Sequence, residues 1–329
     1  MRYHFPMLAF IVRRLGQAIL VMLAVGLIAF SLFRYVGDPV VYMGGQDATE
    51  EQRVQWRRDL GLDRPFFVQY WGFVKNAVRG EFGLSLRQVQ PVSRLIVERL
   101  PATLELSLVA ALLALLAGIP MGIYTALRPR SWFSHLLLAA SLAGVSLPTF
   151  LIGILLILVF SVQLGWLPSF GRGDVVMLGW WSTGFLTVSG LKSLILPSIT
   201  LGLFQMTLIQ RLVRSEMLEV LRTDYIRFAR ARGLTDRAVH FRHALKNTLV
   251  PVITITGLQL GAIIAFAIIT ETVFQWPGMG LLFIQSVNFA DVPVMAAYLC
   301  LVATFFVVIN LVVDLLYYAV DPRLRIEPT

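Results

Sequence analysis

Among the side chains inside long apolar runs of this 329-residue chain, six that exchange hydrogen bonds or carry charge need to be explained. They are four amides and two carboxyl groups: Gln205, Gln210, Gln259, Asn310, Glu271 and Asp314. If the runs cross a membrane, an ionisable group there costs about 2.5–3.5 kcal/mol on insertion scales, so such groups usually face protein or water. The chemistry that these residues offer is hydrogen bonding to a polar solute or to a neighbouring helix.

Three of the six are candidates for contact with a solute. Gln205 and Gln259 lie in the two apolar runs that flank a strongly charged segment, and we interpret them as lining a pathway. Glu271 stands near the end of its run, where contact with a substrate, contact with a docking protein and capping of a loop remain open alternatives. Asn310 and Asp314 lie four residues apart on one helical face, and for them we favour an interhelical hydrogen bond, worth about 1 kcal/mol, over a pathway role.

Catalytic and metal-binding motifs are missing from the sequence. It contains no phosphate-binding loop of the form Gly-x-x-x-x-Gly-Lys-Ser/Thr, and so lacks the usual residues that hold the phosphates of ATP. It contains no His-Glu-x-x-His or Gly-x-Ser-x-Gly motif, and we interpret His240 and His243 as surface residues. The single cysteine, Cys300, excludes an internal disulfide bond and a metal site built on cysteines. The sequence therefore predicts a protein that is not an enzyme.

Composition identifies an integral membrane protein. The chain is 57% hydrophobic and 14% charged, against about 25% charged residues in a typical soluble domain. Its mean hydropathy of +0.75 agrees with this. The net charge of +9 does not favour a nucleic-acid partner, because most basic residues stand at the ends of apolar runs, where they orient a membrane protein.

Six apolar runs approach the ~20 residues that a membrane-spanning helix needs. They are Leu15–Phe33, Thr103–Leu127, His135–Leu164, Leu194–Gln210, Leu249–Phe274 and Val294–Val320. The first is longer than the apolar part of a signal peptide, so we expect a retained helix. Pro148 and Pro197 are expected to kink the third and fourth helices. With six spans, most clustered Lys and Arg fall on one side, which makes both termini cytoplasmic.

The segment between the first two runs is long and nearly neutral, with ten Lys and Arg against eight Asp and Glu from Arg34 to Arg99. Thr49-Glu50-Glu51-Gln52 is typical of a capping box that begins a helix. Gly61 is expected to end that helix, and Pro65 to prevent its continuation. We therefore expect this segment to be partly helical and to lie outside the cell membrane.

The charged segment Arg211–Lys246 holds nine Lys and Arg and four Asp and Glu. Apolar residues from Glu216 to Arg232 follow one helical face, and Gly233 is expected to end the helix. A second helix is expected to begin at Thr235 or Asp236. Two interpretations remain open: a helix lying on anionic lipid headgroups, and a helix that fits a groove on another protein.

Several motifs resemble one family of membrane proteins, the ABC-importer permeases, and within it the dipeptide/oligopeptide/nickel branch. They are Asp224–Leu234 (DYIRFARARGL), Arg242–Asn247 (RHALKN), Gly37–Pro39, Leu60–Pro65, Leu100–Leu106, Thr270–Phe274, Trp276–Gly280, Asn310–Tyr317 and Asp321–Arg323. The chain departs from the generic permease motif at Arg227-Phe228-Ala229, which replaces Glu-Ala-Ala, and at Lys246, which replaces Pro. Val36 stands where many members have Pro. The peptide-type branch commonly departs in this way at the first two points.

The resemblance implies an all-α protein of the cytoplasmic (inner) membrane with six transmembrane helices and the type I ABC importer permease fold. Residues 1–101 are then a first helix with a periplasmic segment, 102–321 the transmembrane core with a coupling segment 215–248, and 322–329 a cytoplasmic tail. The family's partners are a second permease subunit, two ATPase subunits, a periplasmic substrate-binding protein and membrane lipid. ATP and Mg are bound by the ATPases, so no cofactor is expected in this chain.

The resemblance also places the contact with the ATPases on the helix Met217–Arg232 and the glycine after it. The residues concerned are Met217, Leu218, Leu221, Asp224, Tyr225, Arg227, Ala229, Arg230, Ala231 and Gly233. The function implied is the import of di- or oligopeptides by alternating access between inward-open and outward-open states. The alternatives are a nickel or other small-solute permease and, in a different class, a membrane enzyme or receptor scaffold.

Overall fold

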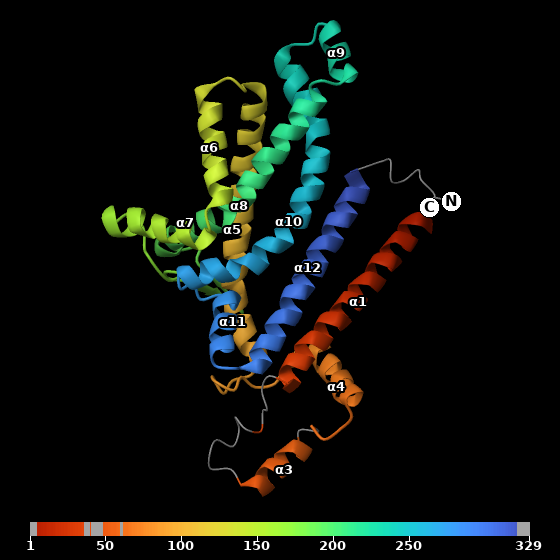
Figure 1. Ribbon diagram of the computed structural model, residues 1–329, viewed down its shortest axis with the longest axis vertical. Helices are drawn as coiled ribbons and strands as arrows, with labels where there is room; N and C mark the ends of the chain where they lie inside the picture. The colour runs from red at the N-terminus through yellow and green to blue at the C-terminus, as the bar shows by residue number, and fades with distance from the viewer. Residues whose placement is uncertain (1–4, 36–39, 41–48, 60–61, 321–329) are drawn as a thin grey trace. The chain divides into compact units, whose positions relative to one another are not determined.

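The computed structural model describes residues 5–35, 40, 49–59 and 62–320, and these are mostly helical (Figure 1). The helices are α1 Phe5–Tyr35, α3 Glu50–Asp59, α4 Phe66–Val78, α5 Val92–Leu127, α6 Trp132–Ser146, α7 Thr149–Leu156, α8 Val188–Val220, α9 Asp224–Ala231, α10 Leu245–Val273, α11 Met279–Asn288 and α12 Val292–Val320. Two π-helices, η1 Ile157–Gln163 and η2 Ala238–Ala244, and two paired strands, β1 Val176–Leu178 and β2 Trp181–Thr183, complete the set. The all-α prediction is confirmed. The motifs Gly37–Pro39 and Asp321–Arg323, the pair Leu60–Gly61 and the tail 322–329 lie outside the described residues.

Within the described residues, four helices are long and apolar enough to cross a membrane, namely α1, α5, α8 and α12. Two bent pairs bring the number to six if each pair is one span: α6 with α7 and η1, and the two halves of α10. The six predicted runs all fall on these elements. The predicted fourth run, Leu194–Gln210, is only the middle of α8, because helical hydrogen bonding continues beyond the apolar residues into polar ones.

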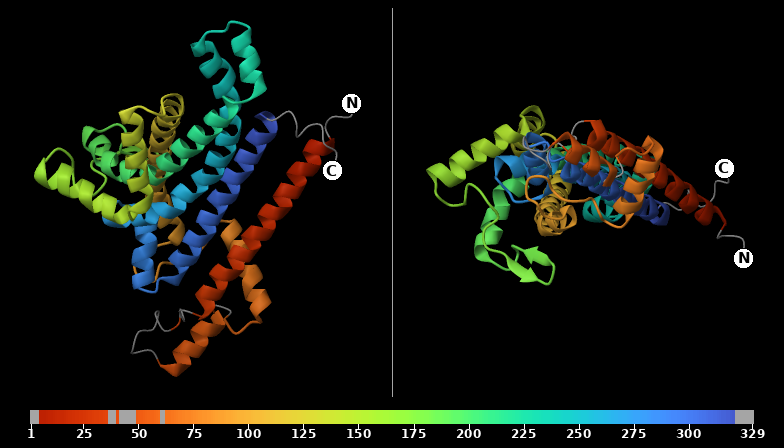
Figure 2. Two further views of the ribbon diagram at one scale, coloured as in Figure 1. Left: turned by 45° about the horizontal axis from the view of Figure 1, so that its top comes forward. Right: turned by 90° about the horizontal axis from the view of Figure 1, so that it is seen from below.

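The third predicted span is not a single kinked helix. Its two halves, Trp132–Ser146 and Thr149–Gln163, meet at an angle of 114°, and Figures 1 and 2 show α7 turning away from α6. Pro148 explains the break, because a proline has no N–H to donate and disfavours helical geometry in the residue before it. Leu147 accordingly has an extended backbone, with ψ of 138°. Pro197, by contrast, lies inside α8, which continues without interruption.

The chain divides into two compact units. Unit 1 comprises Met1–Pro101, Met177–Ser182 and Pro277–Val307, and unit 2 comprises Ala102–Val176, Thr183–Trp276 and Val308–Thr329. The helices α5 and α12 each pass from one unit into the other.

Unit 1 is built around the beginning of α5, packed against α11 and α12. Its core consists of Val92, Leu95, Ile96, Met279, Leu282, Val294, Ala297 and Tyr298. The predicted capping box at the start of α3 is confirmed, since the N–H of Gln52 donates to Thr49 Oγ1 and the N–H of Thr49 donates to Gln52 Oε1. Pro65 directly precedes α4, as predicted for a residue that blocks the preceding helix.

Unit 2 is organised by close packing of α5 on α8. Small residues occupy every fourth position of α5: Ala110, Ala114, Gly118, Gly122 and Ala126. A Cβ atom added at Gly118 would lie 2.9 Å from the carbonyl oxygen of Met206, and one added at Gly122 would lie 2.6 Å from Cβ of Val213. Such stripes let helix backbones approach closely in a membrane, where van der Waals packing replaces the hydrophobic effect. The α5–α8 contact is therefore tight along most of its length.

The predicted single helix Met217–Arg232 is two helices in the structure. The helix α8 ends at Val220, residues 221–223 form a turn, and α9 begins at Asp224. Thr223 has an extended backbone, with φ of −68° and ψ of 152°, as residues just before a helix usually do. The predicted apolar face is therefore only partly correct: beyond the turn Ala229 is buried, but Tyr225 and Phe228 are exposed and Ile226 is buried in their place.

Candidate coupling segment and substrate cavity

The charged segment folds into a small helical bundle at one end of unit 2, formed by α9, η2 and the adjoining ends of α8 and α10 (Figures 1 and 2). A compact apolar cluster holds it together: Ala126, Met217, Ile226, Ala229, Val239 and Ala244 are all buried. Leu218 and Leu221 are partly buried against this cluster. The segment is thus a structured projection of the protein rather than a loose loop.

The predicted coupling residues separate into two groups by exposure. Asp224, Tyr225, Arg227, Arg230, Ala231 and Gly233 are exposed. Met217 and Ala229 are buried, at 0% and 4% exposure, and point into the cluster. Only the first group, joined by Phe228, is accessible at this surface, while Met217 and Ala229 hold α9 in position.

Gly233 ends α9, as predicted, and does so through its backbone conformation. Its φ is +78°, the N–H of Gly233 donates to the carbonyl of Arg230, and the N–H of Leu234 donates to the carbonyl of Ala229. These two bonds form a Schellman motif, which favours glycine at this position. A Cβ atom there would meet no atom within 4 Å, so space inside this chain does not require glycine.

Two further contacts shape the exposed surface of the segment. Arg227 Nη1 lies 3.2 Å from Asp224 Oδ1, an ion pair within one turn of α9. The hydroxyl of Tyr225 lies 2.6 Å from Nδ1 of His243, so this side chain connects α9 to η2. The prediction that His243 is a plain surface residue was incomplete, since it is half-buried and anchors Tyr225. The second predicted helix begins as expected, with the N–H of Ala238 donating to Thr235 Oγ1.

The two glutamines predicted to line a pathway come together in unit 2. Gln205 of α8 and Gln259 of α10 both line a cavity of about 270 Å³, bounded also by the break at Leu147-Pro148. Its other walls are aliphatic and aromatic, with Thr149 and Thr270 the remaining polar residues. Gln205 is 3% exposed, and its Nε2 has no hydrogen-bond partner.

The other four amide and carboxyl residues singled out from the sequence are placed differently. Gln210 lies five residues after Gln205 on α8 and is wholly buried. Neither its Oε1 nor its Nε2 has a hydrogen-bond partner. Glu271 is also wholly buried, and its Oε1 accepts a hydrogen bond of 2.6 Å from Thr103 Oγ1. Asn310 is half-buried, and the side chain of Asp314 lies outside the described residues. Among Gln205, Gln259 and Glu271, the structure therefore brings only the first two to one cavity.

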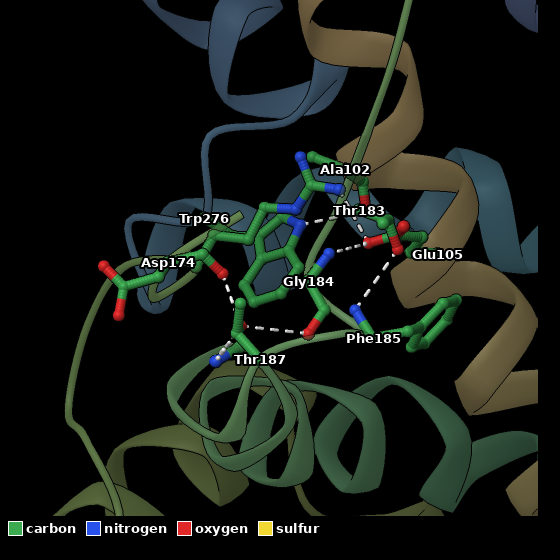
Figure 3. Close-up of polar contacts among 10 residues, drawn as sticks. Ala102, Glu105, Asp174, Thr183, Gly184, Phe185, Thr187 and Trp276 are labelled. Atoms are coloured by element: carbon green, nitrogen blue, oxygen red, sulfur yellow. Dashed lines mark hydrogen bonds and ion pairs between the residues drawn. The ribbon is translucent and has the colours of Figure 1, made fainter. Parts of the chain in front are cut away.

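A buried ion pair in unit 2 was not anticipated from the sequence. Arg172 Nη2 donates to Glu105 Oε2 at 2.6 Å, and the side chains are 6% and 1% exposed. The same oxygen accepts from the N–H of Gly184 at 3.2 Å, as Figure 3 shows beside the hydrogen bond from Trp276 Nε1 to the carbonyl of Ala102. One carboxylate of α5 thus holds both ends of the segment 172–184. The available signal was Glu105 itself, a carboxyl group inside an apolar run.

The loop that leads into α8 is ordered by a second set of hydrogen bonds. Thr187 caps α8, accepting from the N–H of Gly190, and its hydroxyl donates to the carbonyl of Asp174 at 2.6 Å (Figure 3). Ser189 Oγ donates to the carboxylate of Asp174 at 2.6 Å. Within the described residues, no group of three or more His, Cys, Asp or Glu side chains is placed to hold a metal ion.

Comparison with known proteins agrees with this architecture. Residues 118–326 match the family described as "Binding-protein-dependent transport system inner membrane component", and residues 7–107 match its N-terminal companion family. The chain is 43% identical to the di/tripeptide transport system permease protein DppB of Pseudomonas aeruginosa, with 97% of this chain and 99% of that protein covered. It is 40% identical to the dipeptide transport system permease protein DppB of Escherichia coli K12, with the same coverage.

Solved structures show the same fold. An inward-facing structure of the MetNI methionine ABC transporter superposes with a TM-score of 0.54 at 19% identity, covering 69% of this chain and 96% of that one. At this identity the likeness concerns the fold alone, and it agrees with the type I importer permease fold expected from the sequence. The chain therefore belongs to the family of inner membrane components of binding-protein-dependent transport systems.

Proposed function

We propose that this chain is the permease subunit of an ATP-driven importer that carries di- or oligopeptides across the inner membrane. The observation that carries the proposal is identity of 39–43% to peptide permeases over 97–98% of this chain. In this proposal a second permease subunit completes the pathway, two ATPase subunits supply the energy, and a periplasmic binding protein delivers the peptide. Both termini of the chain lie in the cytoplasm.

The exposed surface of α9 is the proposed contact with an ATPase subunit. Its exposed side chains combine charge and aromatic rings, with Tyr225 and Phe228 being 50% and 63% exposed. Aromatic residues and arginine are the residue types enriched at protein interfaces. Because Ile226 and Ala229 anchor α9 on the end of α8, a displacement of α9 moves α8 with it. Coupling in this proposal consists of ATPase closure that shifts α9 and, through it, the spans.

The proposed substrate pathway passes the cavity that Gln205 and Gln259 line. Amide groups suit a peptide, since they donate to and accept from its backbone. Glu271 supports the pathway indirectly in this proposal, because it is buried beside Thr103 and does not face the cavity. A ligand shifts a conformational equilibrium only through its different affinity for the two states. The ATPases must therefore contact α9 differently in the inward-open and outward-open states.

The test is reconstitution of the complete transporter in vesicles, with peptide uptake and peptide-stimulated ATP hydrolysis measured together. Arg230→Glu reverses a charge on the exposed face of α9 and is expected to reduce both activities at least about tenfold, as truncation of a buried interface contact does. Arg130→Glu makes the same change in the exposed turn between α5 and α6 and serves as the control.

The contact at α9 and the assignment of peptides as the substrate would be contradicted by different results. Equal activity of Arg230→Glu and Arg130→Glu would remove α9 as the ATPase contact. Failure of the intact complex to accumulate any peptide, with nickel or another solute accumulated instead, would overturn the peptide assignment itself.

A further inference from the structure

The cavity of unit 2 has a composition that a transport channel for polar solutes does not need. Apart from Gln205, Gln259, Thr149 and Thr270, every residue lining it is apolar. It is bounded on one side by the Pro148 break, where α6 and α7 diverge, and on others by α8 and α10, and it is partly open, since the lining residue Phe266 is 61% exposed. The structure thus places a small apolar chamber next to an amide group.

The amide of Gln205 is left unsatisfied in this chamber. Its side chain is 3% exposed and its Nε2 has no hydrogen-bond partner. Buried donors without partners are uncommon, and each calls for an explanation such as an ion, a water molecule or a ligand. The terminal torsion of a glutamine side chain is soft, so a modest rotation directs the donor toward a group in the cavity.

The volume of the cavity limits how much of a solute it can hold. An apolar cavity of about 150 Å³ accommodates benzene. The cavity here, at about 270 Å³, has room for one aromatic or branched side chain together with an adjoining peptide group. It lies just below the range of about 300–1,000 Å³ that whole small-molecule ligands occupy. The fit is therefore to part of a peptide, not to a complete oligopeptide.

We propose that this cavity is a substrate subsite that seats one apolar side chain of the transported peptide while Gln205 donates to the neighbouring peptide carbonyl. Gln259, half-buried on the facing helix, lies at the same cavity as the second polar contact. The proposal rests on the proposed function, and it adds that the permease itself distinguishes peptides by their side chains. A bulky apolar side chain of the peptide packs against the apolar walls of the cavity, whereas glycine has no side chain that could make these contacts.

Two substitutions test the subsite in the reconstituted complex, with Gly-Gly, Ala-Ala, Ala-Leu and Ala-Phe as substrates. Ala262→Phe fills the cavity from α10, and Ala265→Phe, an exposed position on the same helix outside the cavity, is its control. Ala262→Phe is expected to raise the half-saturating concentration for Ala-Phe and Ala-Leu about tenfold relative to Gly-Gly. The same binding protein serves every variant, so a changed ratio reports on the permease.

The second substitution removes the donor without filling the cavity. Gln205→Leu is expected to raise the half-saturating concentration for all four dipeptides about tenfold, because the peptide carbonyl is common to them. Gln210→Leu is the control, since it removes another buried, unpartnered amide of α8 that does not line the cavity. If Ala262→Phe fails to assemble, Gln205→Leu and its control decide the question.

Different results would contradict the subsite and the proposed function. Equal effects of Ala262→Phe and Ala265→Phe, or of Gln205→Leu and Gln210→Leu, would overturn the subsite and leave the cavity to water or lipid. Absence of uptake for every dipeptide by the unmodified complex would instead overturn the proposed function. If the unmodified complex takes up dipeptides, but the cavity variants change the half-saturating concentrations no more than their controls do, only the subsite is overturned.

Discussion

Two ion pairs of unit 2 lie at opposite ends of α8, and their surroundings differ completely. Glu105 and Arg172, next to the loop that enters α8, are 1% and 6% exposed. Asp224 and Arg227, beyond the other end, are 94% and 74% exposed. A helix of 33 residues separates them, which is roughly 50 Å at 1.5 Å per residue. The same pairing chemistry is therefore found both in the interior and on the surface of unit 2.

The difference indicates what each pair contributes. Removing one partner of a buried pair leaves an uncompensated charge, which is strongly unfavourable, so Glu105 and Arg172 must stay together. An exposed pair contributes little to stability because water and salt screen it. Its charges therefore remain available to an incoming partner. One end of unit 2 is constrained by its ion pair, and the other leaves its charges exposed.

The largest expected effect comes from breaking the buried pair. Glu105→Gln removes the charge opposite Arg172 and is expected to lower the free energy of unfolding by about 3–5 kcal/mol. Glu98→Gln, on the same helix but in an exposed pair with Arg94, is the control and is expected to change little. Denaturation of the purified chain in detergent measures both. Similar losses in the two variants would contradict the distinction drawn between the pairs.

A smaller effect is expected from the glycine that ends α9. Gly233→Ala must adopt a φ near +78° with a Cβ atom, which costs about 1 kcal/mol, whereas Gly233→Asn tolerates this conformation better. Stability and coupled ATP hydrolysis are both measured. If Asn restores both, the glycine serves backbone geometry. Asn that restores stability but not coupling would instead show that a partner approaches Gly233 closely.

The smallest effect on stability is expected at the exposed pair. Asp224→Asn and Arg227→Gln should leave the unfolding midpoint unchanged, since both side chains are solvated. They are nevertheless expected to reduce peptide-stimulated ATP hydrolysis, because the proposed contact with the ATPase uses these charges. Arg94→Gln on α5, in a comparable exposed pair, is the control for hydrolysis. Loss of stability without loss of coupling would reverse the roles assigned to the two ends.

Features that depend on neighbouring residues were predictable from the sequence. The capping box at Thr49 and Gln52, the helix stop at Gly233 and the cap at Thr235 involve residues within five positions of one another. The apolar runs are equally local, because a membrane span requires a continuous stretch. The position of the Pro148 break was also readable, although its angle of 114° was not, since the packing of α7 sets that angle.

Long-range contacts were decided only by the tertiary structure. Glu105 and Arg172 are 67 residues apart, and nothing in the spacing of either predicts the other. The same holds for Gln205 and Gln259, which share a cavity, and for Glu271, which does not line it. The inward orientation of Met217 and Ala229 likewise depends on how α9 folds back against α8 and η2.

The sequence by itself determined that the chain crosses a membrane, where its helices run and where several of them begin and end. These properties follow from hydropathy and from hydrogen bonds between near neighbours. Only the tertiary structure decided which polar groups are satisfied inside the protein, which line a cavity and which face outward. The physical reason is that burial and pairing depend on contacts between distant segments, and a periodic apolar pattern is compatible with many such arrangements.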